Sequence, residues 1–494
     1  MTDLMTDIPV SQLTIEEADL ERQCVQQITS HLAINTKRSE AYDAKQFIQH
    51  FDIAVPPQMK SLQTVLGWPA KAVDIFESLL ELDGFVIPGF EPREFGIDSI
   101  EAANRMNIEL PQAHTTALKY GCAFLAVTQG GEGEPAAVIR ALSPTNSTVL
   151  WDRNRRRARA ALTMSQDKIT EEADFALFLD THTVFGHREK GLWSVERQAH
   201  SLGEVPVTLM AFKPSLEDPF GRSRISQAVL SITARAVRTL LRMEATAEFY
   251  SAPQRAILGL GEDDFESEDG SSPDKWVMLM SKMLMLPSNM EGQVPSIQQF
   301  AQASMQPHID MLRSEAALFA GETNIPVNVL GIIHDNPASD AAMHTAYLAL
   351  NKDAERAQAT FGAGVVKAMQ LAWRISNGGA ELPEPLVKMQ ANYRDPDTPT
   401  KASMSQAVIG QVTAGILPPV SPTTYGLLGY DKPLIESLMA EARRKSNSFS
   451  LLDLAAAKIT GTEPSTEAPA GSTGEARQAW PNTVPKLPEE PAAK

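Results

Sequence analysis

The sequence contains very little cysteine and lacks the long apolar runs of a membrane protein. Only Cys24 and Cys122 occur in 494 residues, which excludes a disulfide framework and a four-thiolate metal site within one chain. No apolar run approaches the ~18 residues that a membrane helix needs. The acidic start MTDLMTDIPVSQLTIEEADLE has neither the basic nor the apolar region of a secretory signal. We therefore expect a soluble chain made in the cytoplasm, with both cysteines buried as small hydrophobic residues.

The motifs of several common enzyme classes are also missing. No G-x-x-x-x-G-K-[ST] run is present to hold phosphates, and GGEGEP at 130–135 places carboxylates beside its glycines, which favours a hairpin turn. Neither H-E-x-x-H nor G-x-S-x-G occurs. Asp395 and Asp397 lie in the turn RDPDTPT, where aspartate caps turns, whereas a nuclease needs carboxylates on rigid elements to hold Mg²⁺. The sequence predicts a protein that is not an enzyme, with no catalytic residue, metal site or cofactor.

What the chain does have is a globular composition with a large excess of acid. Hydrophobic residues make up 43% and charged residues 21%, and the formal net charge at pH 7 is -17. This charge disfavours tight wrapping of nucleic acid, because neutralising phosphates requires clustered lysine and arginine. It is compatible with a surface past which DNA slides.

Hydrophobic periodicity predicts an α+β order of elements. Residues 12–120 are predicted to be mainly helical, with Thr14 and Glu17 as a capping pair at the first helix. Short β-type runs separated by turns follow over 121–212 and predict a meander packed on these helices.

Longer helices dominate the second half of the predicted order. One is expected from about residue 223 to 250, and another with Pro307 in its first turn. A third begins near Ser339, and Gly362 and Gly364 are expected to interrupt it with a kink.

Two basic clusters stand out in this acidic chain. RNRRRAR at 153–159 could contact phosphate, but a solvated hairpin tip explains it better. The stretch RSRISQAVLSITARAVRTLLRM at 222–243 carries five arginines and no acidic residue. If it is helical throughout, four of these arginines fall within about 60° of one helix face.

Several stretches together resemble a known family. VPVTLMAFKPSLEDPFGRSRISQAV, the helix ending in APQRAILGLG, and QFAQASMQPHIDMLRSEAALFAGETNIPVNVLGIIHDNPASDAA resemble the portal proteins of tailed bacteriophages, of the Gram-positive siphophage type. The resemblance covers about residues 20 to 450 and rests on the order of the elements. It implies an α+β subunit with a mixed α/β wing, a two-helix stem, a small clip and a helical crown, which assembles as a ring.

The order of the elements assigns each part of such a subunit to a range of this chain. The ranges are 1–221 for the wing, 222–250 and 302–321 for the stem helices, 251–301 for the clip, 322–376 for the tunnel loop and a long kinked helix, 377–460 for a helical wing or crown region, and 461–494 for a disordered tail.

The implied function is that of a ring of about twelve copies at one capsid vertex, the conduit for DNA packaging and ejection. The implied partners are other copies of the chain, double-stranded DNA, the terminase large subunit, a head–tail connector or adaptor, and the major capsid and scaffold proteins, without a membrane. The implied location is the virion, after assembly in the host cytoplasm. A head-associated adaptor or minor capsid protein, or a nuclease, remains as an alternative.

Two sets of candidate site residues accompany this function. The resemblance places the tunnel loop, expected close to DNA, at Ile332, Ile333, His334, Asp335, Asn336, Pro337, Ala338, Ser339 and Asp340. The basic stripe consists of Arg224, Arg235, Arg238 and Arg242, and its candidate acidic partners on the second stem helix are Asp310, Glu315 and Glu322. Our hypothesis is that the stripe makes ion pairs between helices or subunits first, and contacts DNA or capsid second.

Overall fold

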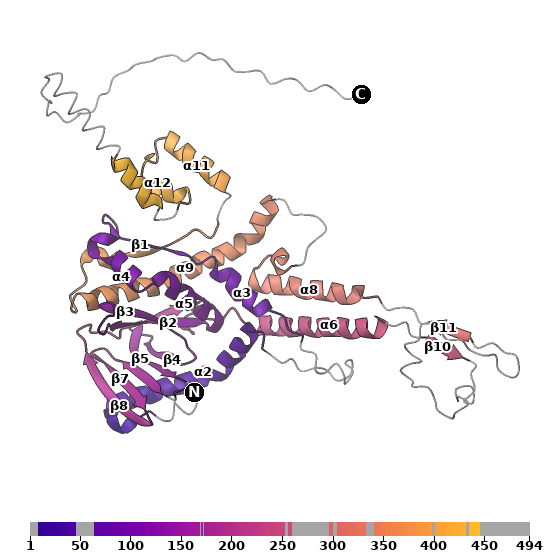
Figure 1. Ribbon diagram of the computed structural model, residues 1–494, viewed down its shortest axis with the longest axis horizontal. Helices are drawn as coiled ribbons and strands as arrows, with labels where there is room; N and C mark the ends of the chain where they lie inside the picture. The colour runs from indigo at the N-terminus through magenta and orange to yellow at the C-terminus, as the bar shows by residue number, and fades with distance from the viewer. Residues whose placement is uncertain are drawn as a thin grey trace, which may run out of the picture. The chain divides into compact units, whose positions relative to one another are not determined.

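The computed structural model has an α+β fold, as predicted (Figure 1). It describes residues 8–45, 64–167, 169–170, 172–251, 255–258, 296–299, 304–331, 340–397, 401–430 and 434–444. The chain divides into two compact units, Met1–Asp397 and Thr398–Lys494. Across these described ranges, no helix combines the length and apolarity that crossing a membrane requires.

The first unit begins with helices whose starts follow from local chemistry. The Thr14 hydroxyl accepts a hydrogen bond from the Glu17 amide at 3.3 Å, and the Glu17 carboxylate accepts one from the Thr14 amide at 2.7 Å. This reciprocal pair starts helix α2 as predicted. The helical elements of this region are η1 (Val10–Gln12), α2 (Ile15–Tyr42), α3 (Trp68–Glu77), η3 (Pro92–Phe95), α4 (Ile97–Ala103) and α5 (Met106–Tyr120).

Two antiparallel sheets follow, and the predicted meander is confirmed. One sheet has the order β4-β5-β6-β7-β8, so each strand pairs with the next along the chain, and the other has the order β3-β2-β9. Their strands are β2 (Cys122–Gln129), β3 (Ala137–Leu142), β4 (Ser147–Asp152), β5 (Arg157–Gln166), β6 (Ala173–Phe178), β7 (His182–Glu189), β8 (Leu192–Ala199) and β9 (Val207–Ala211). The arginine-rich stretch 153–159 spans the turn between β4 and β5, which confirms the hairpin tip.

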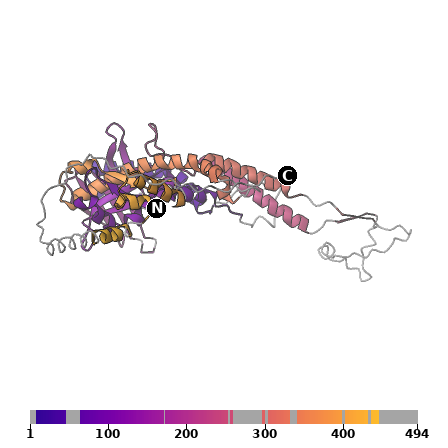
Figure 2. The same cartoon turned by 90° about the horizontal axis from the view of Figure 1, so that it is seen from above.

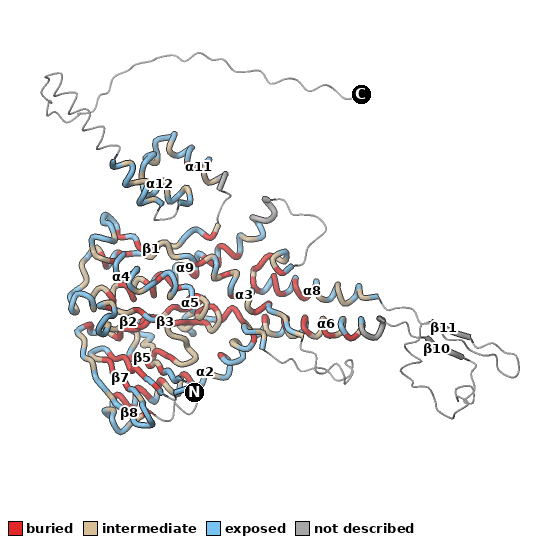
Figure 3. Tube along the Cα trace, in the orientation of Figure 1, coloured by how far each residue is buried: buried red, intermediate tan, exposed pale blue. Residues whose placement is uncertain are grey.

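The core lies between these sheets and the helices, as the buried positions in Figure 3 show. Cys24 of α2 packs among the side chains of β5 and β6, and Cys122 packs in a separate cluster. Burial raises the pKa of each thiol to about 12. Both cysteines are therefore inert buried residues, as expected from the sequence.

Two long helices leave the sheets side by side in both views (Figure 1 and Figure 2). They are α6 (Gln227–Ser251) and α8 (Gln306–Thr323), and Pro307 lies in the first turn of α8, as predicted. Helix α6 begins later than expected because residues 223 and 224 bind the end of α5. The Ser223 hydroxyl donates to the Lys119 carbonyl at 2.6 Å, and the Arg224 amide donates to the Leu118 carbonyl at 2.8 Å.

The range assigned to the clip is described only in part. Strands β10 (Arg255–Leu258) and β11 (Ser296–Gln299) pair antiparallel, after α6 and before α8 respectively. The rest of this range, and the predicted tail at 461–494, lie outside the described residues.

Helix α9 (Asp340–Ser376) runs without a break through both of its predicted interruption points. The helix is continuous at both glycines, which serve close packing, and a bend of its axis at them stays a prediction. A Cβ atom on Gly364 would lie 2.7 Å from the Leu209 carbonyl oxygen of β9, and one on Gly362 would lie 3.3 Å from the Ala391 side chain.

The range 377–460 is not uniformly helical, contrary to the prediction. Strand β12 (Gln390–Tyr393) pairs with β1 (Leu82–Val86) near the start of the chain and belongs to the first unit. The remaining named elements are η5 (Val327–Leu330) and α10 (Glu384–Val387) in the first unit, and α11 (Lys401–Thr413) and α12 (Pro422–Leu427) in the second.

Candidate functional site

Arg224, just before α6, is buried, with 8% of its surface exposed. Its Nε donates to the Ala72 carbonyl of α3 at 2.5 Å, and its Nη2 donates to the Thr323 carbonyl of α8 at 2.8 Å. Burial lowers the pKa of Arg224 to about 10, so the side chain stays charged at neutral pH. Its predicted place on the same helix face as the other three arginines was wrong, because the chain is not helical there and the guanidinium points into the subunit.

A buried carboxylate balances this charge. Asp353 of α9 accepts hydrogen bonds from Lys213 Nζ at 2.7 Å and from Asn324 Nδ2 at 3.1 Å. Burial alone would raise the pKa of Asp353, but these hydrogen bonds and the charges of Lys213 and Arg224 lower it below its usual value. Together these residues fix the end of α8 to α3 and to α9.

The other three arginines of the stripe lie on α6 and act on one buried carboxylate of α8. Glu315 is 7% exposed, and its Oε1 accepts a hydrogen bond from the Thr239 hydroxyl at 3.2 Å. Burial raises the pKa of Glu315, and the charges of Arg235, Arg238 and Arg242 oppose that shift. The structure thus brings these arginines and Glu315 together within one chain.

The two other predicted acidic partners contact residues outside the stripe within this chain. Asp310 accepts from Gln306 Nε2 at 2.9 Å and lies 3.9 Å from Arg313 Nη1, both on its own helix. Glu322 accepts from the Ser226 hydroxyl at 3.0 Å, just before α6 begins. Within this chain the predicted pairing is therefore seen at Glu315, and pairing of Asp310 or Glu322 with another copy of the chain stays a prediction.

The predicted tunnel loop is almost wholly outside the described residues. The described residues do not include 332–339, and Asp340 is the first residue of α9. The 3-10 helix η5 that precedes the loop ends at Leu330, and the next residue, Gly331, has a left-handed φ of 84°.

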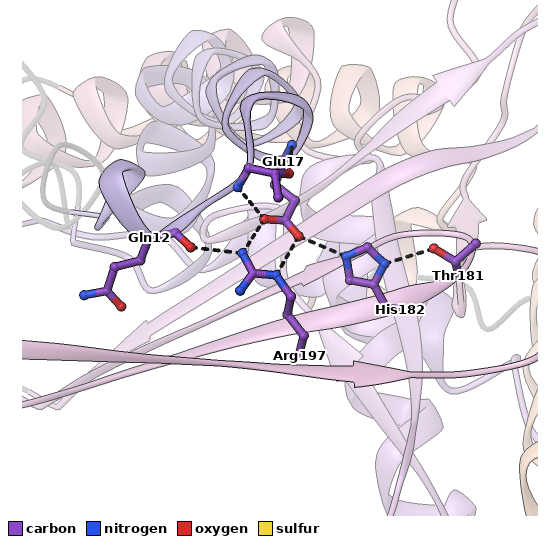
Figure 4. A network of polar contacts seen from close by, with 6 residues as sticks. Gln12, Glu17, Thr181, His182 and Arg197 are labelled. Atoms are coloured by element: carbon purple, nitrogen blue, oxygen red, sulfur yellow. Dashed lines mark hydrogen bonds and ion pairs between the residues drawn. The ribbon is translucent and has the colours of Figure 1, made fainter.

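Sequence reasoning missed a polar network around the buried Glu17 in the first unit (Figure 4). The carboxylate of Glu17 accepts from Arg197 Nε at 2.9 Å and Nη2 at 2.6 Å, and contacts His182 Nε2 at 3.0 Å. Hydrogen bonding by Arg197 is the main cause that lowers the pKa of Glu17 to about 2. The network ties α2 to strands β7 and β8, and its only local signal was the capping role of Glu17.

Comparison with known proteins decides the family. Residues 23–419 match the family model described as "Phage portal protein, SPP1 Gp6-like". The chain belongs to this phage portal protein family. The portal protein of Mycobacterium phage D29 is 30% identical over 375 residues, covering 74% of this chain and 76% of that protein. The portal protein of Mycobacterium phage L5 is 29% identical over 384 residues, covering 76% of this chain and 77% of that protein.

The portal family predicted from the sequence is thereby confirmed, and it is a structural family. Solved structures to which the chain is similar include the "Virion of native gene transfer agent (GTA) particle", at 12% identity and a TM-score of 0.42, covering 82% of this chain and 98% of that chain. Another is the "Neck of native GTA particle computed with C12 symmetry", at 13% identity and a TM-score of 0.41, covering 81% and 99%.

The matched residues 23–419 include Arg224 and Asp353 with their contacts, and Glu315 with the three arginines of α6. Within the ranges that the structure describes, no group of three or more His, Cys, Asp or Glu side chains could hold a metal ion.

Proposed function

We propose that copies of this chain form a closed ring at one vertex of a phage capsid, through which double-stranded DNA enters during packaging and leaves during ejection. The family match over residues 23–419 carries this proposal. The stem is the pair α6 and α8, the clip is the segment between them, and the loop before α9 lies closest to DNA.

The charge of the chain suits a conduit. A formal net charge of -17 per copy is multiplied around a ring, so the channel holds the DNA backbone weakly. Weak holding matters because tight phosphate contacts would become barriers at each step of translocation. In this proposal the ring is passive, and the energy for packaging comes from the terminase.

The proposed partners follow from a position at the vertex. The clip receives the terminase large subunit during packaging and the head–tail connector afterwards, and the wing contacts the major capsid and scaffold proteins. The chain then has no cofactor and no catalytic activity, and it is located in the virion after assembly in the host cytoplasm. The arginines 235, 238 and 242 contribute to assembly of the ring before any contact with DNA.

The ring is tested by native mass spectrometry and negative-stain imaging of the purified full-length chain. We expect a closed ring of about twelve copies with a central pore. A compact monomer at every protein concentration contradicts the proposal and supports the alternative of a head-associated adaptor or minor capsid protein.

The loop before α9 is tested by deletion of residues 334–337. We expect intact rings and a loss of DNA packaging. The matched control is deletion of residues 131–134, which also removes four residues, in the turn between β2 and β3. Normal packaging by the first variant contradicts a role of the loop at DNA.

A further inference from the structure

A pocket of about 450 Å³ opens beside the arginine-rich hairpin tip of the first unit. Leu150, Trp151, Pro219 and Phe220 supply its apolar lining, and Gln23 and Gln27, one turn apart on α2, add two side-chain amides. Trp151 and Phe220 are only half buried. This volume and this mixture of apolar and amide groups are typical of a site that receives a side chain or a small ligand.

The border of the pocket is strongly basic. Arg153 and Arg159 line it, and Arg155, Arg156 and Arg157 are exposed on the adjoining tip. The Arg159 guanidinium is held at the pocket by a hydrogen bond to Gln23 Oε1 at 2.9 Å, and that of Arg153 by one to the Glu217 carbonyl at 3.0 Å. Five arginines in seven residues are exceptional in a chain with a net charge of -17.

We propose that this pocket and tip dock an acidic peptide segment of a partner protein, with one large apolar side chain in the pocket and flanking carboxylates at Arg153 and Arg159. The inference does not depend on the ring, since all its residues come from one chain. Charge complementarity selects an acidic partner, and the Trp151 and Phe220 lining selects an aromatic or large aliphatic anchor.

Two other modes of binding fit the site less well. A continuous row of phosphates would pass the carboxylate of Asp152, which lines the pocket between the arginines, whereas a peptide can place its carboxylates at Arg153 and Arg159 alone. Strand addition to β4 is hindered although β4 is an edge strand of its sheet. Its pairing with β5 shifts register between Leu150 and Trp151, and such a bulge twists an edge away from a new strand.

The test uses fluorescence anisotropy of the full-length chain with a panel of labelled ten-residue peptides. Each peptide carries glutamates around a central Trp, Phe, Leu or Ser, and matching peptides carry lysines instead. A ten-nucleotide single strand of DNA is the nucleic acid probe. We expect saturable binding of the glutamate peptides with Trp, Phe or Leu, and at least about tenfold weaker binding of the Ser peptide.

Variants locate the binding on the chain. Arg153→Ala and Arg159→Ala are each expected to weaken binding of the Trp peptide by about fivefold at low salt. Gln27→Phe, on the half-exposed rim, is expected to fill the pocket and abolish the preference for Trp over Ser. Arg140→Ala, an exposed arginine on β3, is the control and should change nothing.

Three results would overturn the docking site. The first is an absence of saturable binding by every glutamate peptide. The second is equal binding of the Ser and Trp peptides, because charge alone would then attract them and no side chain would enter the pocket. The third is tighter binding of the DNA strand than of any peptide, with the same loss in the arginine variants, which assigns the tip to nucleic acid.

Discussion

The guanidinium of Arg224 lies over the ring of Phe76, with its Cζ atom 4.1 Å from the ring centroid. A buried cation over an aromatic face is stabilised by the ring quadrupole, and here the same cation also donates to carbonyls of α3 and α8. The base of the proposed stem is therefore held by one charged side chain from the segment before α6.

Replacing Arg224 with methionine should destabilise the first unit strongly. The substitution keeps an unbranched side chain over Phe76 but leaves the Ala72 and Thr323 carbonyls without their donor and removes a positive charge near Asp353. We expect a loss of about 2–4 kcal/mol in the free energy of unfolding. Urea unfolding at a fixed protein concentration measures it. The control is Arg140→Met, at an exposed ion pair on β3, which should cost less than about 0.5 kcal/mol. Equal losses in the two variants would show that the buried contacts of Arg224 do not stabilise the first unit.

Replacing Glu17 with glutamine should remove a pH-dependent part of the stability. The pKa of Glu17 in the folded chain is about 2, below its unfolded value. Its contribution is therefore complete above the unfolded pKa of about 4.3, and is lost as the pH falls from about 5 toward 2. We expect Glu17→Gln to lose on the order of 2 kcal/mol at pH 7 and to show a flatter stability profile below pH 5.

The neighbouring residue supplies the control for this experiment. Glu16 is on the same first turn of α2 but is exposed to solvent. Glu16→Gln should leave both the stability at pH 7 and the acid profile almost unchanged. If the two variants behave alike in urea unfolding at pH 7 and pH 3, the network in Figure 4 does not stabilise the chain.

Two glycine-to-alanine changes should shift the melting temperature in opposite directions. A Cβ atom on Gly364 would lie 2.7 Å from the Leu209 backbone oxygen, whereas one on Gly321 of α8 meets nothing within 4 Å. We expect Gly364→Ala to lower the melting temperature, with a cost of about 1–3 kcal/mol. Gly321→Ala should raise it, since alanine favours a helix over glycine by about 0.5–1 kcal/mol. Calorimetry of the two variants side by side decides whether close packing explains the glycines of α9.

The sequence predicted those features that depend on neighbouring residues. The capping pair of Thr14 and Glu17, the meander over β4 to β8 and the start of α8 at Pro307 each follow from a short pattern. The contact of Glu17 with Arg197 joins residues 180 positions apart, and no local pattern encodes it. The position of Arg224 was missed for a related reason. The projection onto a helix assumed that α6 begins before residue 224, but Ser223 and Arg224 bind the end of α5 instead.

Charge reversal on α6 tests what the remaining stripe does. Arg235 is exposed and Arg238 is half buried, and both act on the buried Glu315 of α8. Changing both arginines to glutamate places like charges beside Glu315, which destabilises the helix pair and any ring built from it. We expect the ring fraction in negative-stain images to fall severalfold at a fixed protein concentration, and Arg140→Glu on β3 to leave it unchanged. Intact rings with impaired DNA packaging would contradict a role of these arginines in assembly. They would show that the arginines act on DNA first.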